Sequence, residues 1–168
     1  MLRLAVFATL PAILIAATPA LGASGHDTPY YQGKTRLGLG GGGYSNGGFI
    51  DVFVAASFGV FVVDNLELGV DAAIHFGDDD PVAQLGPQLR YILPIDKRIH
   101  PYLGAFYRHW FGPAALAYAD SAGGRAGVLL RTGHVYLAAG VAFEAALSDC
   151  AGDGCSEWYP EFGASLLF

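Results

Sequence analysis

The chain has 168 residues, of which nine are Lys or Arg and 15 are Asp or Glu, so its formal net charge is −6. This length suits one domain, and the negative charge argues against nucleic acid as a partner. Hydrophobic residues make up 53% of the chain and 24 residues are glycine, which excludes both a disordered chain and an ordinary helical domain. Nine basic residues are too few to coat a soluble surface well, so many apolar side chains must face something other than water.

Residues 1–23 have the pattern of a secretory signal peptide. Arg3 supplies a short positive region, residues 4–17 form an apolar stretch, and small residues follow at Ala20 and Ala23. The stretch is shorter than the roughly 20 residues that a membrane-spanning helix needs. We therefore expect this segment to direct export and to be removed, and we expect residues 24–33 to form a short N-terminal periplasmic segment.

Polarity alternates with a period of two along much of the remaining chain. Between residues 66 and 76 the even positions are all apolar, whereas the odd positions include Glu67, Asp71 and His75. This period is that of a β-strand with one apolar face, and no helical period fits it. The same rule, applied along the chain, predicts strands near residues 34–43, 49–62, 66–76, 83–93, 100–111, 125–132, 135–147 and 157–168.

The expected connections alternate between short turns and, mostly, longer loops, and both termini fall on the side of the short turns. An even number of strands arranged in this way is the topology of an outer-membrane barrel. A strand of about 11 residues, tilted by about 40°, spans the roughly 25 Å of the apolar band. We therefore predict an all-β fold, an eight-stranded antiparallel up-and-down transmembrane β-barrel over residues 34–168.

Aromatic residues gather near the expected ends of the strands, where amphipathic rings favour a membrane interface. The alternative is that they form the core of a soluble β-sandwich, because alternation alone does not say which face is wet. The low lysine content and the terminal Phe168 favour the barrel. The residues expected at the interfaces are Tyr107, Trp110, Phe111, Trp158 and Tyr159 on one side, and Tyr91 and Phe168 on the other.

Charged residues of both signs share the face that would point into the lumen. Their near balance predicts mutual pairing, because an unpaired charge in a closed interior costs several kcal/mol. Arg90 is expected to bridge Glu67 and Asp71, and Arg108 is expected to lie between Glu144 and Glu161. Because side chains just fill the interior of an eight-stranded barrel, we favour a polar plug over an ion path. The lumen residues are Arg36, Asp51, Glu67, Asp71, His75, Arg90, Arg108, Arg131, Glu144 and Glu161.

Two loops carry further candidate sites. Cys150 and Cys155 enclose four residues in the last outer loop, and export to an oxidising compartment favours a local disulfide over a two-cysteine metal site. Asp78, Asp79 and Asp80 could hold a hard cation, although a solvated acidic loop is the simpler interpretation. The five histidines fall in different elements, so zinc binding is unsupported, and the pattern predicts no catalytic residue and no cofactor.

The chain resembles the small outer-membrane β-barrel family typified by OmpA and OmpX. The resemblance rests on the hairpin of residues 59–69, on the segments 86–91 and 101–105, and on the final strand, together covering most of the mature chain. It implies a barrel and says nothing about activity. The loop that carries Cys150 and Cys155 departs from the general pattern of the family.

These observations predict a monomeric protein of the bacterial outer membrane with a structural or surface-interaction role. Expected partners are membrane lipid and lipopolysaccharide, an extracellular ligand at the outer loops, and the barrel-assembly machinery, which would read Phe162, Leu166 and Phe168 in the C-terminal strand. Two alternatives stay open. The first is a lipid A modifying enzyme such as a deacylase, which lacks support because the His-x-Ser pairing of that family is absent: no histidine here has a serine two residues later. The second is a small passive pore.

Overall fold

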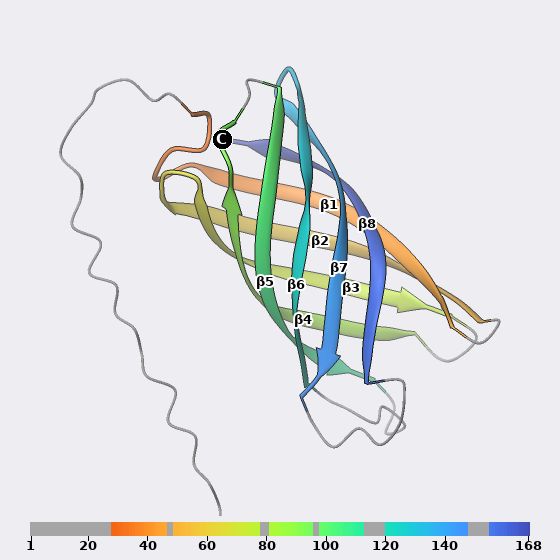
Figure 1. Cartoon of the computed structure of the whole chain (residues 1–168). Helices are drawn as coiled ribbons and strands as arrows, with labels where there is room; N and C mark the ends of the chain where they lie inside the picture. The colour runs from red at the N-terminus through yellow and green to blue at the C-terminus, as the bar shows by residue number, and fades with distance from the viewer. Residues whose placement is uncertain (1–27, 47–48, 78–80, 96–97, 113–119, 148–154) are drawn as a thin grey trace, which may run out of the picture.

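Eight antiparallel strands form one closed barrel, in which every strand pairs with its neighbours in sequence and β1 also pairs with β8 (Figure 1). The structure is a computed structural model that describes residues 28–46, 49–77, 81–95, 98–112, 120–147 and 155–168. The strands are β1 (Thr35–Asn46), β2 (Phe49–Val63), β3 (Leu66–Phe76), β4 (Val82–Ile92), β5 (Ile99–Phe111), β6 (Asp120–Thr132), β7 (Val135–Ala146) and β8 (Ser156–Leu167). The predicted fold class is confirmed.

The predicted boundaries hold to within three residues except at β6. This strand begins at Asp120, five residues earlier than the alternation indicates. The added residues, 120–124, include two glycines and no large apolar side chain, so they carry little periodic signal. They nevertheless complete the ladders on both sides, where Ser121 pairs with Arg108 of β5 and with Ala146 of β7. No helix among the described residues is long and apolar enough to cross a membrane.

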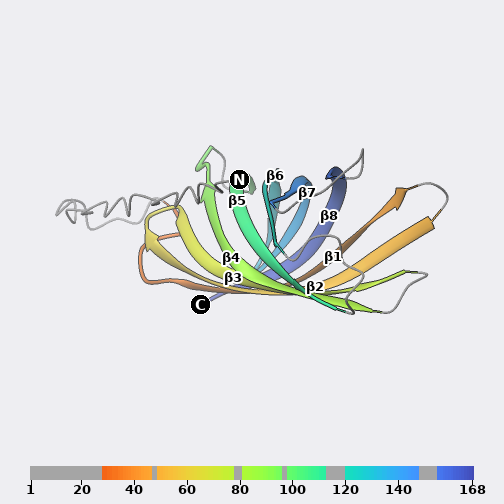
Figure 2. The ribbon, with the colours of Figure 1, turned by 90° about the horizontal axis from the view of Figure 1, so that it is seen from below.

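The two ends of the barrel differ. The C-terminus and the tight turns after β2 and β6 lie together at one end, which we call the terminal end (Figure 1). Asn65 and Gly133 adopt positive φ angles of 66° and 65° in these turns, a conformation that glycine and asparagine tolerate best. We call the opposite end, where β1 leads to β2 and β7 leads to β8, the loop end. Figure 2 shows the strong twist of the sheet as it curls into the barrel.

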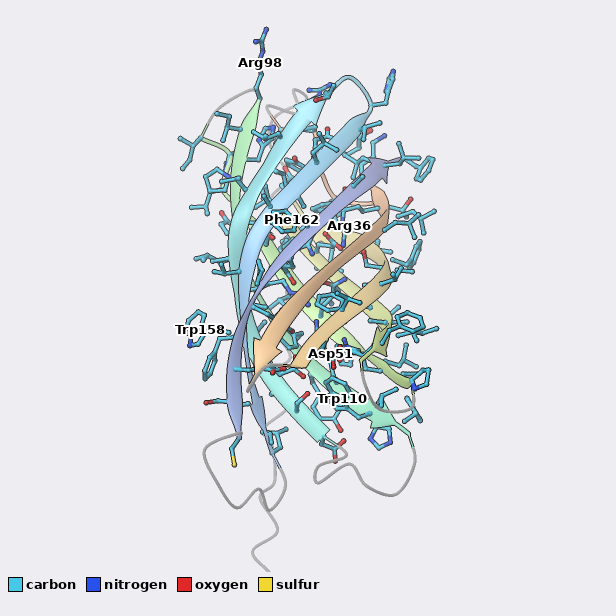
Figure 3. All side chains as sticks on the ribbon, turned by 90° about the vertical axis from the view of Figure 1, so that its right-hand side faces the viewer. Arg36, Asp51, Arg98, Trp110, Trp158 and Phe162 are labelled. Carbon is cyan, nitrogen blue, oxygen red and sulfur yellow. The ribbon has the colours of Figure 1, made fainter. Side chains whose placement is uncertain are left out.

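The faces of the sheet are reversed relative to a soluble protein. In β3, Glu67, Asp71 and His75 are buried, whereas Val70 and Ile74 are about half exposed on the outside. Figure 3 shows the same division: Arg36, Asp51 and Trp110 lie within the barrel, and Trp158 projects away from it. The apolar face therefore points outward on this barrel and the charged face points inward, as expected for a transmembrane barrel.

The seam that closes the barrel, between β1 and β8, is short. Its described register runs from Arg36 opposite Leu167 to Gly42 opposite Glu161, and Thr35 and Phe168 exchange backbone hydrogen bonds of 3.2 and 2.9 Å at the terminal end. The ladder stops where Pro160 enters β8. The carbonyl oxygen of Pro160 faces β1. In a β-strand the backbone N and O of one residue point toward the same neighbouring strand. Because proline has no N–H group, Pro160 cannot donate a hydrogen bond to β1 at this position.

Gly86 marks the tightest contact between strands. A Cβ atom at Gly86 would lie 1.8 Å from the backbone oxygen of Tyr107 on β5, whereas a Cβ atom at Gly124 would meet only the oxygen of Gly104 at 3.6 Å. We expect Gly86→Ala to destabilise the folded barrel by about 1–3 kcal/mol, because β4 and β5 must separate. Gly124→Ala should change the free energy of unfolding by less than about 0.5 kcal/mol. Urea unfolding in detergent micelles measures both, and equal effects would contradict this account of the β4–β5 contact.

Candidate functional site

The interior of the barrel is the candidate site. One aromatic cluster lies at the terminal end and a second lies nearer the loop end, and a network of charged residues, which we call the middle layer, interleaves with both. Four arginines and four acidic residues make up this network, so its charges balance in number. The residues of the middle layer are Arg36, Arg90, Arg108, Arg125, Glu67, Asp71, Glu144 and Glu161.

Arg36 and Glu67 form the best-defined ion pair of the middle layer. Nε of Arg36 donates to both carboxylate oxygens of Glu67, at 3.0 and 2.9 Å, and Nη2 donates to Oε1 at 2.8 Å. Nη1 also reaches the Ser57 hydroxyl at 3.2 Å. Glu67 is fully buried, and a Cβ atom at Gly59 would lie 1.9 Å from its Oε1. The carboxylate therefore requires a glycine at position 59 on the adjacent strand β2. The ion pair links β1 to β3 through the lumen.

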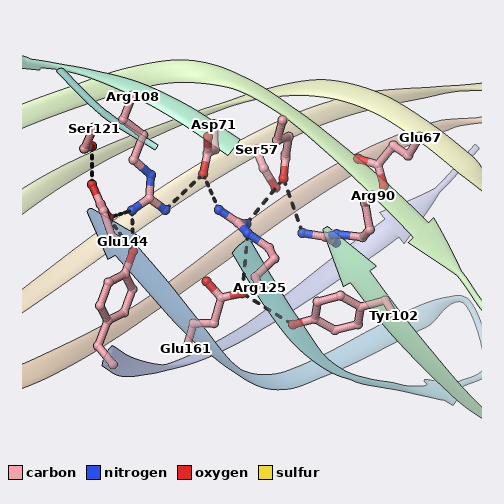
Figure 4. Close-up of polar contacts among 12 residues, drawn as sticks. Ser57, Glu67, Asp71, Arg90, Tyr102, Arg108, Ser121, Arg125, Glu144 and Glu161 are labelled. Carbon is pink, nitrogen blue, oxygen red and sulfur yellow. Dashed lines mark hydrogen bonds and ion pairs between the residues drawn. The ribbon is translucent and has the colours of Figure 1, made fainter. Parts of the chain in front are cut away.

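Asp71 stands at the centre of the network and joins two arginines (Figure 4). Its Oδ2 accepts hydrogen bonds from Nη2 of Arg125 at 2.9 Å and from Nη2 of Arg108 at 3.4 Å. The two guanidinium groups also contact the ring of Phe106, at 4.7 and 4.0 Å from its centroid. Such contacts offset part of the cost of burying charge, because a guanidinium is attracted to the face of an aromatic ring. Arg125 further approaches Glu161, with Nε 3.8 Å from Oε1.

Glu144 collects hydrogen bonds on the side of the network nearer the loop end. It accepts from Arg108 Nη1, from the Ser121 hydroxyl and, at 2.7 Å, from the Tyr159 hydroxyl. Trp110 in turn donates from Nε1 to the Ser121 hydroxyl at 2.9 Å. Four strands, β5 to β8, are thereby tied together around one carboxylate. A buried carboxylate held by this many donors has little freedom to move, so the arrangement is rigid rather than open to solvent.

Residues 28–33 fold into the mouth of the barrel at the terminal end. Tyr30 is 1% exposed and its ring packs against Phe61, His100 and Tyr136, with centroid distances of 5.1–5.5 Å. Backbone bonds hold the segment in place: the Asn65 amide donates to the Tyr30 carbonyl at 2.7 Å. Burial raises the pKa of the Tyr30 hydroxyl, so the side chain stays neutral. The N-terminal segment, expected only to lie in the periplasm, thus forms an aromatic stopper.

The structure places most of the expected lumen residues inside but corrects several of their partners. Arg90 does not bridge Glu67 and Asp71: it lies opposite Glu67, two residues from the expected register, while Arg36 takes the Glu67 carboxylate. Arg108 binds Glu144 as expected, but its second carboxylate is Asp71 and not Glu161. Glu144 lies opposite Glu157 in the β7–β8 ladder, which also departs from the expected register.

Two expected positions near the rims also need correction. Arg131 shares the inward side of β6 but lies beyond the packed interior, where it is exposed and donates to the Gly133 carbonyl at 3.3 Å, so it is no part of the network. Trp110 and Tyr159, expected among the interfacial aromatics, point into the lumen, whereas Tyr107, Phe111 and Trp158 face outward. Asp51 is inward but only partly buried, with Oδ1 3.6 Å from Nδ1 of His75.

Arg125 belongs to the network although the expected lumen set does not include it. The predicted strand begins at Arg125, at the edge of a loop. The sequence does carry a signal, because Arg125 and Arg131 lie six positions apart and an even spacing puts both on the same face of a strand. The buried Tyr30 carried no comparable signal, because it precedes the first strand.

Nothing in the described residues resembles a catalytic centre. The nearest set, Ser57, Asp71 and His75, does not converge: Ser57 bonds to Arg36, Asp71 bonds to two arginines, and the His75 ring stacks on Phe53 at 5.1 Å. The described residues hold no group of three or more His, Cys, Asp or Glu side chains able to bind a metal ion. Cys150 and Asp78, Asp79 and Asp80 lie outside the described residues, so the disulfide to Cys155 and the acidic cation site stay predictions.

Comparisons with known proteins agree with this architecture. No family model and no curated protein sequence matches the chain. Among solved structures, the N-terminal β-barrel domain of Pseudomonas aeruginosa OprF aligns with a TM-score of 0.64 and 16% identity over 82% of this chain and 98% of that chain. Neisserial surface protein A aligns with a TM-score of 0.61 and 17% identity over 80% and 96%. The chain has the fold of these barrels. A de novo designed transmembrane β-barrel also aligns, at 0.50, with 17% identity over 82% and 97%. The barrel fold that the resemblance to small outer-membrane proteins implies is confirmed.

The Arg36–Glu67 pair offers a direct test of the charged interior. We expect Glu67→Gln to destabilise the barrel by about 3–5 kcal/mol, because it leaves the Arg36 charge buried without its partner. The double variant Arg36→Gln with Glu67→Gln should lose less stability than the sum of the two single variants. Urea unfolding in micelles gives the values, with the exposed Arg131→Gln as the control that stays near wild type. Additive effects of the two single substitutions would show that the pair is not coupled.

Proposed function

We propose that this protein is an integral protein of the bacterial outer membrane with a structural or surface-interaction role and a closed lumen. The observation that carries the proposal is the reversal of faces. Large apolar side chains such as Leu39, Val54 and Phe162 are more than 60% exposed on the outside, while the ionic residues of the middle layer are enclosed. In water such a surface would aggregate, whereas in a bilayer it is solvated by hydrocarbon.

Aromatic and polar side chains at the loop end support a membrane interface there. Tyr107, His109 and Phe111 succeed one another on the outward side of β5, and both the Tyr107 hydroxyl and Nδ1 of His109 contact Asp120, the latter at 2.8 Å. Amphipathic rings with a polar edge favour the depth of the lipid headgroups. These side chains of β5 would contact the lipopolysaccharide of the outer leaflet, which we propose as one partner.

The packing of the lumen favours a plug over the passive pore. The middle layer is cross-linked by ion pairs, and the Tyr30 segment covers it at the terminal end, so water and ions meet two successive barriers. The alternative of a lipid-modifying enzyme has no convergent nucleophile and base among the described residues. The outer loops, with the proposed disulfide of Cys150 and Cys155, remain the proposed surface for an extracellular ligand.

The C-terminal strand supports the proposed contact with the assembly machinery. Phe162 and Leu166 of β8 and Phe168, which directly follows β8, are 61%, 40% and 61% exposed, so they form an apolar row along the strand that closes the barrel. The expected monomer is part of the same proposal.

Membrane integration can be tested by gel migration. We expect the protein to fractionate with outer membranes and to change its migration on boiling, because a barrel stays folded in detergent until it is heated. Phe168→Ala should lower the amount of the heat-modifiable form, whereas Phe111→Ala, an outward aromatic residue far from the C-terminus, should not. Recovery of the wild-type protein in the soluble fraction would contradict the proposal.

Conductance measurements separate the plug from the pore. We expect the reconstituted wild-type barrel to show no steady open-channel current in planar bilayers. Tyr30→Ala should remain closed as well, because it removes only the stopper and leaves the charged layer intact. Steady currents from the wild-type protein would overturn the plug and favour the pore.

A further inference from the structure

Arg90 differs from the other three arginines of the middle layer. It is 6% exposed, yet it forms no ion pair with any carboxylate of the described residues, whereas Arg36 has one ion pair and Arg108 and Arg125 have two each. Within the described part of the chain, its side chain donates one hydrogen bond, from Nη2 to Oε1 of Gln88 at a long 3.4 Å, and its guanidinium lies 4.9 Å from the ring centroid of Tyr102. Glu67, the residue directly opposite on β3, gives its carboxylate to Arg36.

A cavity of about 70 Å³ adjoins Arg90 inside the barrel. All four buried arginines line it, while only two acidic residues do, Asp71 and Glu161. Asp71 is already held by Arg125 and Arg108, and Glu161 accepts from the Tyr102 hydroxyl at 3.4 Å. The space admits a few water-sized species. The wall therefore carries more positive than negative groups in a volume that fits only a small ligand.

The polar atoms around this cavity that have no hydrogen-bond partner among the described residues are mainly donors. They are Nε of Arg90, Nε of Arg108, Nε of Arg125 and the Ser165 hydroxyl, together with one acceptor, Oδ1 of Asp71. An arginine nitrogen can only donate, so it needs a group that accepts. A cation is excluded as the ligand, because four guanidinium groups would repel it. A water molecule could accept these bonds but would leave Arg90 without a directly bound anionic partner, which is unfavourable for a buried guanidinium.

We propose that this cavity binds a small monovalent inorganic anion of the size of chloride, with Arg90 as its principal ligand and Arg125 and Ser165 as further donors. The bound anion gives Arg90 the direct ionic contact that no carboxylate of the described residues makes with it. The bound anion would thus be a structural part of the plug. This inference depends on the contacts within the lumen and not on the membrane location of the barrel.

The test compares the stability of the barrel in two salts. The protein is folded from urea into micelles of a zwitterionic detergent in sodium chloride or in sodium gluconate at equal ionic strength. Chloride should raise the midpoint of unfolding in a saturable manner, because a ligand that binds only the folded state stabilises it. Gluconate is too large for the cavity and should give no such rise. Equal midpoints in the two salts would overturn the proposal.

Two variants and a crystal locate the site. Arg90→Gln should abolish the difference between chloride and gluconate, whereas the exposed Arg131→Gln should keep it. A chloride effect that survives in Arg90→Gln would overturn the assignment. If Arg90→Gln does not fold, wild-type crystals grown in sodium bromide decide. An anomalous peak beside the Arg90 guanidinium supports the site, and water alone in the cavity, or bromide only at the surface, overturns it.

Discussion

The rest of the structure depends on the pairing of charge inside a barrel too narrow for bulk water. Eight strands enclose an interior that side chains just fill, so each inward ionic group must find its partner across the lumen. The contacts of Asp71 and Glu144 therefore link strands that are not neighbours in the sheet, such as β3 with β5 and β6. These contacts supply cross-bracing that the hydrogen-bonded ladder alone lacks.

Aromatic side chains pack among the ionic groups of the interior. Phe61, Tyr102 and Tyr136 surround Tyr30 at the terminal end, and Phe53, Phe106 and Tyr159 belong to the second apolar cluster. Phe61 lies opposite Glu67, and Phe106 contacts the guanidinium groups of Arg108 and Arg125. These rings keep water away from the ion pairs and so strengthen them, because attraction between charges grows as the surroundings become less polar. The same exclusion makes a buried charge without an ion pair unfavourable, which distinguishes Arg90 from the other arginines.

The period-two pattern was enough to predict the number of strands, their order and the inward face of most charged residues. It could not predict which residues meet, because the register depends on how many residues each loop absorbs. A shift of two residues keeps every side chain on its face but moves Arg90 from Gly69 to Glu67. The pattern does not indicate that Arg125 is inward, because the glycine-rich start of β6 hides the periodicity of this strand. It does not indicate the burial of Tyr30 either, because a residue outside the strands belongs to neither face of the sheet.

The short seam bears on how the chain reaches its folded state. Arg36 and Leu167 are 131 residues apart in sequence, so the seam joins the two most distant strands and carries the largest entropic cost of closure. Hairpins can form locally while the edges of β1 and β8 are still unpaired. Residues 40–43 are all glycine, so the unpaired edge of β1 offers few side chains for contact with a foreign strand, and Pro160 interrupts the unpaired edge of β8. Pro160, beside which the β1–β8 ladder ends, and these glycines therefore make each edge a poor template for aggregation before the barrel closes.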